Sequence, residues 1–249
     1  MTALTDFTEA LWLNRSFRGD VDTPPSATYG HLATSAPADD GTVSGTVSDG
    51  AVLSWAAASD ASSSTDAVAD FGTPAAQTWT HLVVTDSDTW GSGNVRYHGA
   101  LDEPVTTDGE TPLTIPAGDL TITVARTDGR GFTDYLANKN LDHDLRSATY
   151  AGPAVVLLAI TDDTGVEVSG GGYAPEPVEF GAPSDDGGPM RAANTNSGEF
   201  TFGPGEIGGF IYREQDGQDM AVGEFSSTRT VTDGSTATFG PGQFTVSVG

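Results

Sequence analysis

The amino-acid sequence repeats itself at an offset of 128 residues, and this duplication constrains the fold more than any other feature. The segment LTDFTEALWLNRSFR (residues 4–18) aligns without gaps with FTDYLANKNLDHDLR (residues 132–146). The identical positions are Thr5, Asp6, Leu13 and Arg18, which recur as Thr133, Asp134, Leu141 and Arg146, while Tyr135 stands in the place of Phe7. Because self-similarity at a fixed spacing marks a repeated structural unit, both copies are expected to fold alike.

A second pair of similar segments closes the two copies. TDGETPLTIPAGDLTITV (107–124) is similar to TDGSTATFGPGQFTVSV (232–248), which is one residue shorter. Two matching ends in the same order indicate a tandem duplication, and the polar, glycine-containing stretch between the copies is typical of a linker. The sequence therefore predicts one domain at residues 1–126 and another at 127–249, joined at about 125–131, each of ordinary domain size.

Each copy is expected to open with one short helix. In the first copy, Asp6 is the predicted N-cap, because Glu9 follows three residues later as in a capping box. The apolar residues Leu4, Phe7, Leu11 and Phe17 are spaced to lie roughly on one side of this helix.

After the opening helix the apolar pattern changes to a period of two, which indicates β-strands. The segments with this pattern are WTHLVVT (79–85), DLTITV (119–124), AVVLLAIT (154–161), GFIYR (209–213) and QFTVSV (243–248). Gly, Pro, Asp and Asn turns separate them, as in antiparallel sandwiches and barrels. We therefore predict an all-β fold of two tandem antiparallel β-sandwich (jelly-roll-like) domains, each opening with a short α-helix.

The charge is strongly acidic, since 35 Asp and Glu residues face 10 Lys and Arg residues, for a formal net charge of −25. The acids are dispersed over nearly all predicted loops, which disfavours a dedicated cation site, and the 21 aromatic residues disfavour disorder. At molar salt the Debye length falls to about 3 Å, so self-repulsion is screened. The composition therefore indicates a halophilic source, and it excludes nucleic acid as a partner because nothing would neutralise the phosphates.

Neither a membrane segment nor a disulfide framework is expected. The sequence contains no cysteine and no run of about 18 apolar residues, and its first residues carry acids rather than the lysines of a signal peptide. We therefore expect no membrane partner and synthesis in the cytoplasm.

The stretch EVSGGGYAPEPVEFG (167–181) could be a phosphate-binding loop or a bend between strands. A phosphate loop needs a helix directly after its glycines. Pro175 and Pro177 rule out a helix there, but they suit an edge strand. A bulged turn beside which Tyr173 packs is therefore expected.

No residues form a recognisable catalytic or metal-binding motif, so we expect no enzyme, no catalytic residue, no cofactor and no metal site. Of the four histidines, His81 and His98 lie in predicted strands and are expected to be half-buried with hydrogen-bond partners. Asp142 and Asp144 flank His143 on a helix, where adjacent positions do not share a face. The turn TDSDTWGSG (85–93) could hold a cation weakly, but a plain solvated turn is favoured.

Two segments carry a resemblance to known proteins: VEVSGGGYAPEPVEFGAPSDDGGPMRAANTNSGEFTF (166–202) and WTHLVVTDSDTWGSGNVRYHGALDEPVTTDGETPLTIPAGDLTITV (79–124). Both resemble one family, the small tail-fibre-like proteins of tailed bacteriophages. The first copy has GTVSGTVSDGAVLSW (41–55) in place of the glycines. The second has EIGGFIYREQDG (206–217) where the family has a Thr-His pair, so no role can be carried over to His81.

The resemblance and the acidic composition together imply a virion surface protein of a tailed virus of halophilic archaea, here as a tandem duplication. A tail fibre, spike or baseplate component that contributes to host attachment is the favoured role. The alternatives are a capsid turret or decoration protein of the same virus and a cellular halophilic binding module or enzyme. Expected partners are further copies of the chain (a trimer or pentamer), other virion proteins and glycans of the host surface layer.

One aromatic residue is a candidate receptor contact. Trp90 lies in the predicted turn DTWGSGN, where an exposed ring could stack on a sugar. The alternative is that its ring folds back over the end of the sandwich.

Overall fold

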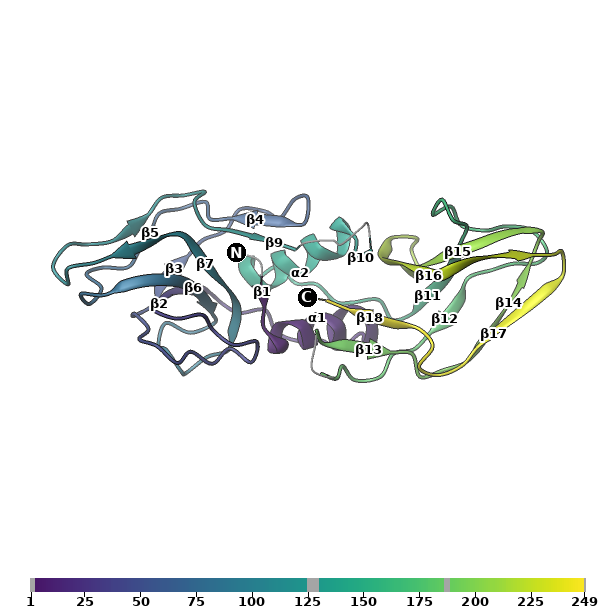
Figure 1. Cartoon of the computed structure of the whole chain (residues 1–249), viewed down its shortest axis with the longest axis horizontal. Coiled ribbons are helices and arrows are strands. Elements are labelled where there is room, and N and C mark those ends of the chain that lie inside the picture. Colours follow the sequence, from purple (N-terminus) through teal and green to yellow (C-terminus); the bar gives the residue numbers. More distant parts are fainter. Residues whose placement is uncertain (1–2, 125–129, 186–188, 249) are drawn as a thin grey trace.

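The computed structural model of the chain describes residues 3–124, 130–185 and 189–248. The molecule is elongated, with two helices in its middle and a β-rich lobe at each end (Figure 1). Both ends of the chain lie near the middle, beside the helices.

The first repeat contains one helix and nine strands. They are β1 (Ala3–Leu4), α1 (Asp6–Arg18), β2 (Thr28–Ala33), β3 (Ala51–Leu53), β4 (Ser62–Ser64), β5 (Ala69–Asp70), β6 (Thr78–Thr85), β7 (Val95–Thr106), β8 (Thr114–Ile115) and β9 (Thr121–Thr123). The second repeat has the same elements in the same order. They are β10 (Gly131–Phe132), α2 (Asp134–Arg146), β11 (Val156–Thr161), β12 (Glu176–Val178), β13 (Arg191–Ala193), β14 (Gly198–Phe202), β15 (Gly205–Glu214), β16 (Asp219–Val231), β17 (Ser235–Phe239) and β18 (Thr245–Ser247).

The two repeats have identical sheet topology. A five-stranded antiparallel sheet has the order β1-β7-β6-β2-β3 in the first repeat and β10-β16-β15-β11-β12 in the second. The pairs β4-β9 and β5-β8 form two short ribbons, and β13-β18 and β14-β17 are their counterparts. The predicted all-β fold class with one short helix per repeat is confirmed, although a two-residue strand precedes each helix.

The helices begin one residue earlier than the sequence suggested. Thr5, not Asp6, is the N-cap of α1, and its hydroxyl accepts a hydrogen bond from the Thr8 amide. Thr133 caps α2 in the same way. Both residue types cap well, but Thr5 is the residue that leaves β1 in an extended conformation, which the N-cap position requires. Gly19 ends α1 in the left-handed region, with φ of 66°.

The buried side of α1 also differs from the predicted one. Phe17 is buried as expected, but Phe7 is 36% exposed and Leu11 is half-buried. Trp12 and Leu13 are fully buried instead. Two neighbours cover the helix, so more than a single amphipathic stripe is removed from water.

These two neighbours belong to different repeats. Helix α1 lies against β1 and β7 of its own repeat and also against β13 and β18 of the other, while α2 lies against β10 and β16 and also against β4. Because β4 and β13 are equivalent strands, each helix contacts the same strand of the other repeat. Each helix therefore bridges the two lobes (Figure 1).

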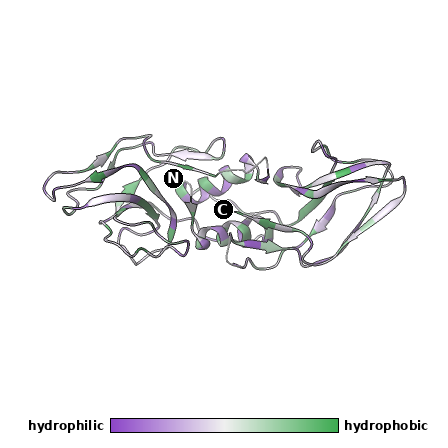
Figure 2. Ribbon diagram, viewed as in Figure 1, coloured by the Kyte–Doolittle hydropathy of each residue, from purple (hydrophilic) through white to green (hydrophobic). Residues whose placement is uncertain are grey.

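The hydrophobic core continues through this junction. Phe17 of α1 packs against Phe132, Phe180 and Tyr212 of the second repeat, with ring centroids 5.3–5.8 Å apart. The buried apolar residues of both repeats form one continuous cluster. Apolar and polar residues alternate along helices and strands (Figure 2), as expected for elements with one side in this core.

The predicted division at residues 1–126 and 127–249 stays a prediction. Residues 125–129 of the expected linker lie outside the described residues, and Gly131 begins β10. In the described part of the chain, neither helix is long and apolar enough to cross a bilayer.

Candidate functional site

A buried polar network joins the two repeats between the helices. Its centre is Asp144 of α2, which is fully buried. Its Oδ1 lies 3.0 Å from the Arg15 guanidinium and 3.4 Å from that of Arg96. Its Oδ2 accepts hydrogen bonds from the Trp12 indole at 2.6 Å and from the Tyr97 hydroxyl at 3.0 Å. Four groups of the first repeat thus converge on one carboxylate of the second.

The network extends to the chain after α1. Arg15 also pairs with Asp22 at 2.7 Å and donates to the Asn140 side chain at 2.8 Å. Burial alone would raise the pKa of Asp22, but the hydrogen bond and charge of Arg15 hold it well below its usual range. Burial, followed by the charge of Asp144, raises the pKa of Tyr97 well above its usual value. Arg15, Trp12 and Tyr97 are all hydrogen-bonded to Asp144, whereas Nε and Nη1 of Arg96 are buried without a hydrogen-bond partner among the described residues.

The predicted separation of Asp142, His143 and Asp144 is observed. Asp142 accepts from the Ala58 amide and pairs with Arg146 at 3.2 Å. His143 is buried, and its Nδ1 accepts from the Tyr150 amide. The three side chains have different partners and do not converge on one point.

One acidic group near the junction has an unusual environment. Glu9 of α1 is only 6% exposed, and its carboxylate accepts a hydrogen bond from the Met190 amide at 2.7 Å. Burial raises the pKa of Glu9 to about 7, and the charges of Asp6, Asp39 and Asp185 act in the same direction. Protonation of Glu9 is therefore linked to the contact between α1 and the second repeat.

The predicted histidine environments hold only in part. His81 is half-buried, and its Nδ1 lies 2.8 Å from the Thr80 hydroxyl, as expected. His98 is buried, and within the described residues its Nε2 has no hydrogen-bond partner, so the expectation of a satisfied ring was wrong there. Burial lowers the pKa of His98 because it disfavours the charged imidazolium.

The predicted turn at Gly170–Gly172 is confirmed. All three glycines have positive φ (86°, 62° and 89°), and the Tyr173 amide donates to the Gly170 carbonyl. A Cβ on Gly171 would lie 2.2 Å from the carbonyl oxygen of Phe202, so only glycine fits. Strand β12 follows at the edge of the sheet and pairs only with β11. Pro177 has no backbone N–H, and it is tolerated there because an edge strand has no second neighbour that would need one.

The ring of Tyr173, directly after these glycines, packs against several phenylalanines. Tyr173 stacks on Phe200 and Phe202, with centroids 5.9 and 6.0 Å apart, and its hydroxyl accepts from the Ile160 amide at 2.6 Å. Phe200 in turn contacts Phe239 at 5.7 Å. The glycine turn thus fixes one wall of the space between the sheets of the second sandwich.

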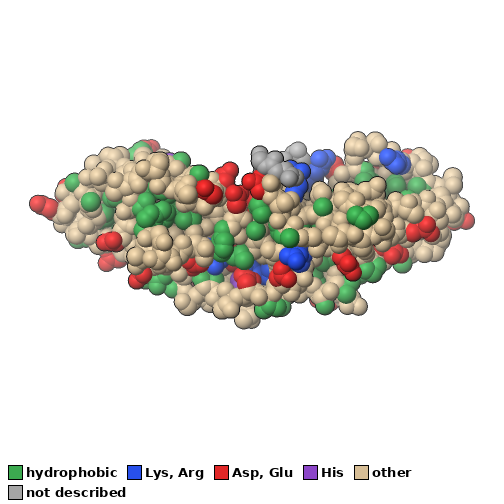
Figure 3. Space-filling model, turned by 90° about the horizontal axis from the view of Figure 1, so that it is seen from below, with side chains coloured by type: hydrophobic (Ala, Val, Ile, Leu, Met, Phe, Trp, Pro, Cys, Tyr) green, Lys and Arg blue, Asp and Glu red, His purple; other side chains and the backbone are tan. Residues whose placement is uncertain are grey.

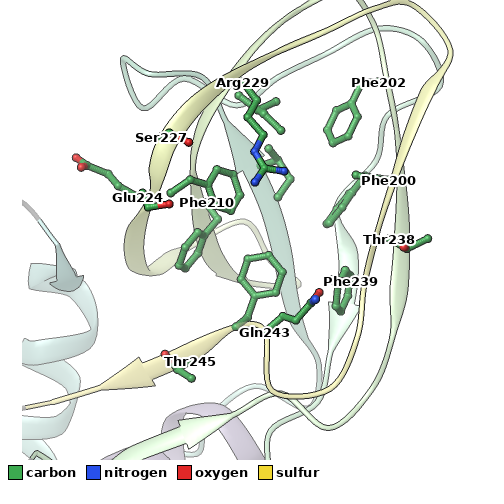
Figure 4. A pocket seen from close by; sticks show the side chains of 16 residues that line it. Phe200, Phe202, Phe210, Glu224, Ser227, Arg229, Thr238, Phe239, Gln243 and Thr245 are labelled. Carbon is green, nitrogen blue, oxygen red and sulfur yellow. The ribbon is translucent and has the colours of Figure 1, made fainter.

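That space is open and forms a pocket of about 600 Å³ (Figure 4). It is lined by Ile160, Phe200, Phe202, Ile207, Phe210, Glu224, Phe225, Ser226, Ser227, Arg229, Ala237, Thr238, Phe239, Gln243, Phe244 and Thr245. Six of these residues are phenylalanines, and seven are polar or charged. Phe210 and Phe225 are only half-buried, so they present accessible ring surface.

This pocket was not predicted from the sequence, although a signal was present. Eight of the 11 phenylalanines of the chain lie after residue 131. They include Phe200 and Phe202, which are two residues apart as on one face of a strand, and Phe225, Phe239 and Phe244. An excess of one large apolar residue in only one of two repeats indicates that the two interiors differ.

The candidate receptor contact Trp90 lies elsewhere, in the turn between β6 and β7 and close to α1. Its ring is half-buried and meets His31 edge-to-face at 5.5 Å. It borders a hollow of about 480 Å³ that Phe7 and Val43 also line. The neighbouring Asp86 accepts hydrogen bonds from Asn94 and pairs with Arg96 at 3.2 Å, as in an ordinary structured turn. Trp90 does not line the phenylalanine pocket of the second repeat.

The surface carries the dispersed acidity that the sequence indicated. Figure 3 shows Asp and Glu side chains spread along the length of one face, with few Lys and Arg side chains among them. In the part of the chain that the structure describes, no group of three or more His, Asp or Glu side chains is arranged to hold a metal ion.

Comparison with known proteins identifies the repeated unit. A model of the family described as Podophage GP4 fiber I protein gp80 matches the chain twice, over residues 3–123 and 131–247. These ranges run from β1 to β9 and from β10 to β18, and they confirm the resemblance to phage fibre proteins. No curated protein matches the chain. The two matches cover nearly the whole sequence, so the chain belongs to this family of phage fibre proteins, with two copies of the family unit in tandem.

Proposed function

We propose that this chain is a tail-fibre component of a tailed virus whose archaeal host lives at molar salt, and that it contributes to host attachment. The observation that carries the proposal is the fibre-family match over both repeats. Membership of that family makes the chain a virion-associated structural protein. A structural rather than a catalytic role is proposed, because the matching family is one of fibre proteins and Asp144 is already engaged by Arg15, Trp12 and Tyr97.

The charge supports the salt-adapted setting. A net charge of −25 is dispersed over the surface, and at molar salt the repulsion between these acids is screened within about 3 Å. In dilute buffer the same charge would destabilise the compact state.

Attachment is proposed to involve glycans of the host surface layer. Trp90 borders a hollow that Phe7 of α1 also lines, where the first lobe meets the helices, and its ring contacts His31 edge-to-face. An aromatic ring fixed beside polar loop groups is a typical sugar contact. Assembly with other virion proteins is expected, as a homo-oligomer: a trimer in a fibre, or a pentamer if the position is a capsid vertex.

Immunogold electron microscopy of purified particles tests this proposal, with antibody raised against residues 1–249. Gold at the tail is the expected result. Gold at the capsid vertices would replace the fibre with a turret or decoration protein. Unlabelled particles, with the protein left in the cell lysate, would refute a virion role.

A second experiment tests attachment separately. Purified protein added to host cells before the virus should occupy receptors and slow adsorption of particles in proportion to its concentration. A Trp90→Ala variant should compete less well if Trp90 contacts the receptor. Unchanged adsorption at saturating protein would leave a virion role intact and refute the role in attachment.

A further inference from the structure

The second repeat has an open interior at the position where the first repeat is filled. Trp79 pairs with Val105 between β6 and β7, and Ile207 pairs with Arg229 at the equivalent place between β15 and β16. Both pairs stand next to the same register shift, which fixes the correspondence. Trp79 is 1% exposed, and its indole donates to the Thr107 hydroxyl at 2.9 Å. The second repeat thus has the smaller Ile207 where the first has Trp79, and Arg229 where the first has Val105.

Arg229 differs from most other arginines of the described residues. Six other arginines in the described residues form ion pairs with Asp or Glu. No carboxylate of the described residues lies within ion-pair distance of Arg229. Figure 4 shows its side chain directed from β16 into the pocket, whereas Glu224 points away from it and is neutralised by Arg130. The guanidinium is therefore available to an anionic group that enters the pocket.

The remaining lining combines apolar surface with hydrogen-bonding groups. Phe210 and Phe225 offer half-buried rings, and Ser227 offers a hydroxyl. The Gln243 carbonyl oxygen accepts from the Gly240 amide, so its NH₂ group remains a donor. A ligand that fits needs an apolar side, several hydroxyls and one negative charge.

We infer that this pocket binds one acidic sugar residue of a surface polysaccharide, with its ring against Phe210 and Phe225 and its anionic group on Arg229. A pyranose ring has an apolar C–H face and a polar edge, which matches the two kinds of lining. A simple acyl chain would leave the hydroxyl and amide groups without partners. At molar salt the long-range repulsion between ligand and protein is screened, so the direct guanidinium contact decides recognition. The inference rests on the proposed role in attachment and names its ligand class.

Binding of defined probes to the intact chain tests the inference. Isothermal titration calorimetry would compare tetragalacturonate with its methyl ester, which has the same backbone without the carboxylates. Decanoate and an acidic phenylalanine-containing peptide serve as the competing ligand classes. We expect binding of tetragalacturonate and at least about tenfold weaker binding of the ester, the usual effect of losing one charged hydrogen-bonding contact. Equal binding of acid and ester, or binding of decanoate or the peptide without the saccharide, would overturn the inference.

Three variants localise the effect. Arg229→Val and Ile207→Trp each introduce the residue of the first repeat, and Arg18→Gln removes an equal charge from an exposed pair with Asp20. The first should weaken tetragalacturonate binding at least about tenfold, the second should abolish it, and the third should leave it unchanged. Circular dichroism checks that each variant is folded. If Ile207→Trp does not fold, the exposed Arg229 position decides alone, and unaltered binding by Arg229→Val refutes the site.

Adsorption competition separates this site from the attachment role. If Arg229→Val loses saccharide binding but the wild-type chain does not slow adsorption, the pocket is supported and the attachment role is refuted. If wild type and Arg229→Val slow adsorption equally and neither binds the saccharide, attachment stands and the pocket inference is refuted.

Discussion

Replacing Asp144 by asparagine should destabilise the fold strongly, because this carboxylate holds the two repeats together. The side chain is fully buried and faces two arginines and two neutral donors. Asparagine keeps the shape, but it removes the negative charge and turns an NH₂ group toward a donor. Removing one partner of a buried ion pair costs about 3–5 kcal/mol.

The surrounding contacts set the value within this range. Arg15 keeps its pair with Asp22 at 2.7 Å, and Arg96 keeps its pair with Asp86 at 3.2 Å. Neither cation is left fully uncompensated, so the loss should fall near the lower end, at about 3 kcal/mol. With a urea dependence of about 2–3 kcal/mol per M, the unfolding midpoint should fall by about 1–1.5 M.

Urea unfolding at constant high salt, followed by circular dichroism, measures this change. Asp20→Asn is the matched control, because Asp20 forms an exposed pair with Arg18 at 3.0 Å. Such pairs contribute up to about 1 kcal/mol, so the control midpoint should move by less than about 0.5 M. Equal shifts for the two variants would show that the charge of Asp144 does not stabilise the junction.

Three further predictions address other parts of the molecule. Glu9→Gln should become more stable relative to wild type as the pH rises from about 4.5 to above 7, measured as melting curves at each pH. The pKa of Glu9 is raised to about 7 in the folded protein, so the stability that neutral Glu9 contributes is complete below the unfolded-state pKa and is lost as the group ionises. Glutamine stays neutral and still accepts the hydrogen bond from the Met190 amide. A difference that does not change with pH would contradict this. Gly171→Ala should cost more than about 2 kcal/mol, because its φ is 62° and its Cβ would overlap the Phe202 carbonyl, whereas Gly172→Ala, with φ of 89° and open space, should cost about 1 kcal/mol. The melting temperature should rise with KCl concentration up to the molar range, and a cooperatively folded protein well below about 0.1 M salt would refute the halophilic interpretation.

The duplication and the strand pattern were predictable because both are properties of local sequence. The offset of 128 residues aligned the helices, and alternation located segments such as β6 and β11. Identical topology in the two repeats follows, since equal patterns give equal registers.

The buried surface of α1 could not be predicted, because distant residues cover it. Arg15 is fully buried only because Asn140 and Asp144, 125 and 129 residues further along the chain, lie against it. An arginine in a short helix ordinarily indicates a solvent-exposed side. The usual assumption that the apolar side of a helix faces its own domain therefore fails for α1, which contacts both repeats.

The pocket escaped prediction for a related reason. The phenylalanine pattern of the second repeat was visible, but alternation shows only which residues point inward and not whether the interior is filled. Filling depends on one position, where Trp79 in the first repeat corresponds to Ile207 in the second. The register of both hairpins was needed to align these two residues.

The same comparison explains why the two repeats of this chain are not interchangeable. Offset by 128 residues, Trp12 corresponds to Asn140 and Ser16 to Asp144, and the structure joins Trp12 to Asp144 and Asn140 to Ser16. The same two positions of the repeat therefore meet twice across the junction, once as Trp12 with Asp144 and once as Asn140 with Ser16. Two first repeats would place Trp12 opposite Ser16 and leave Arg15 without Asp144. The junction contacts therefore depend on residues that differ between the two copies.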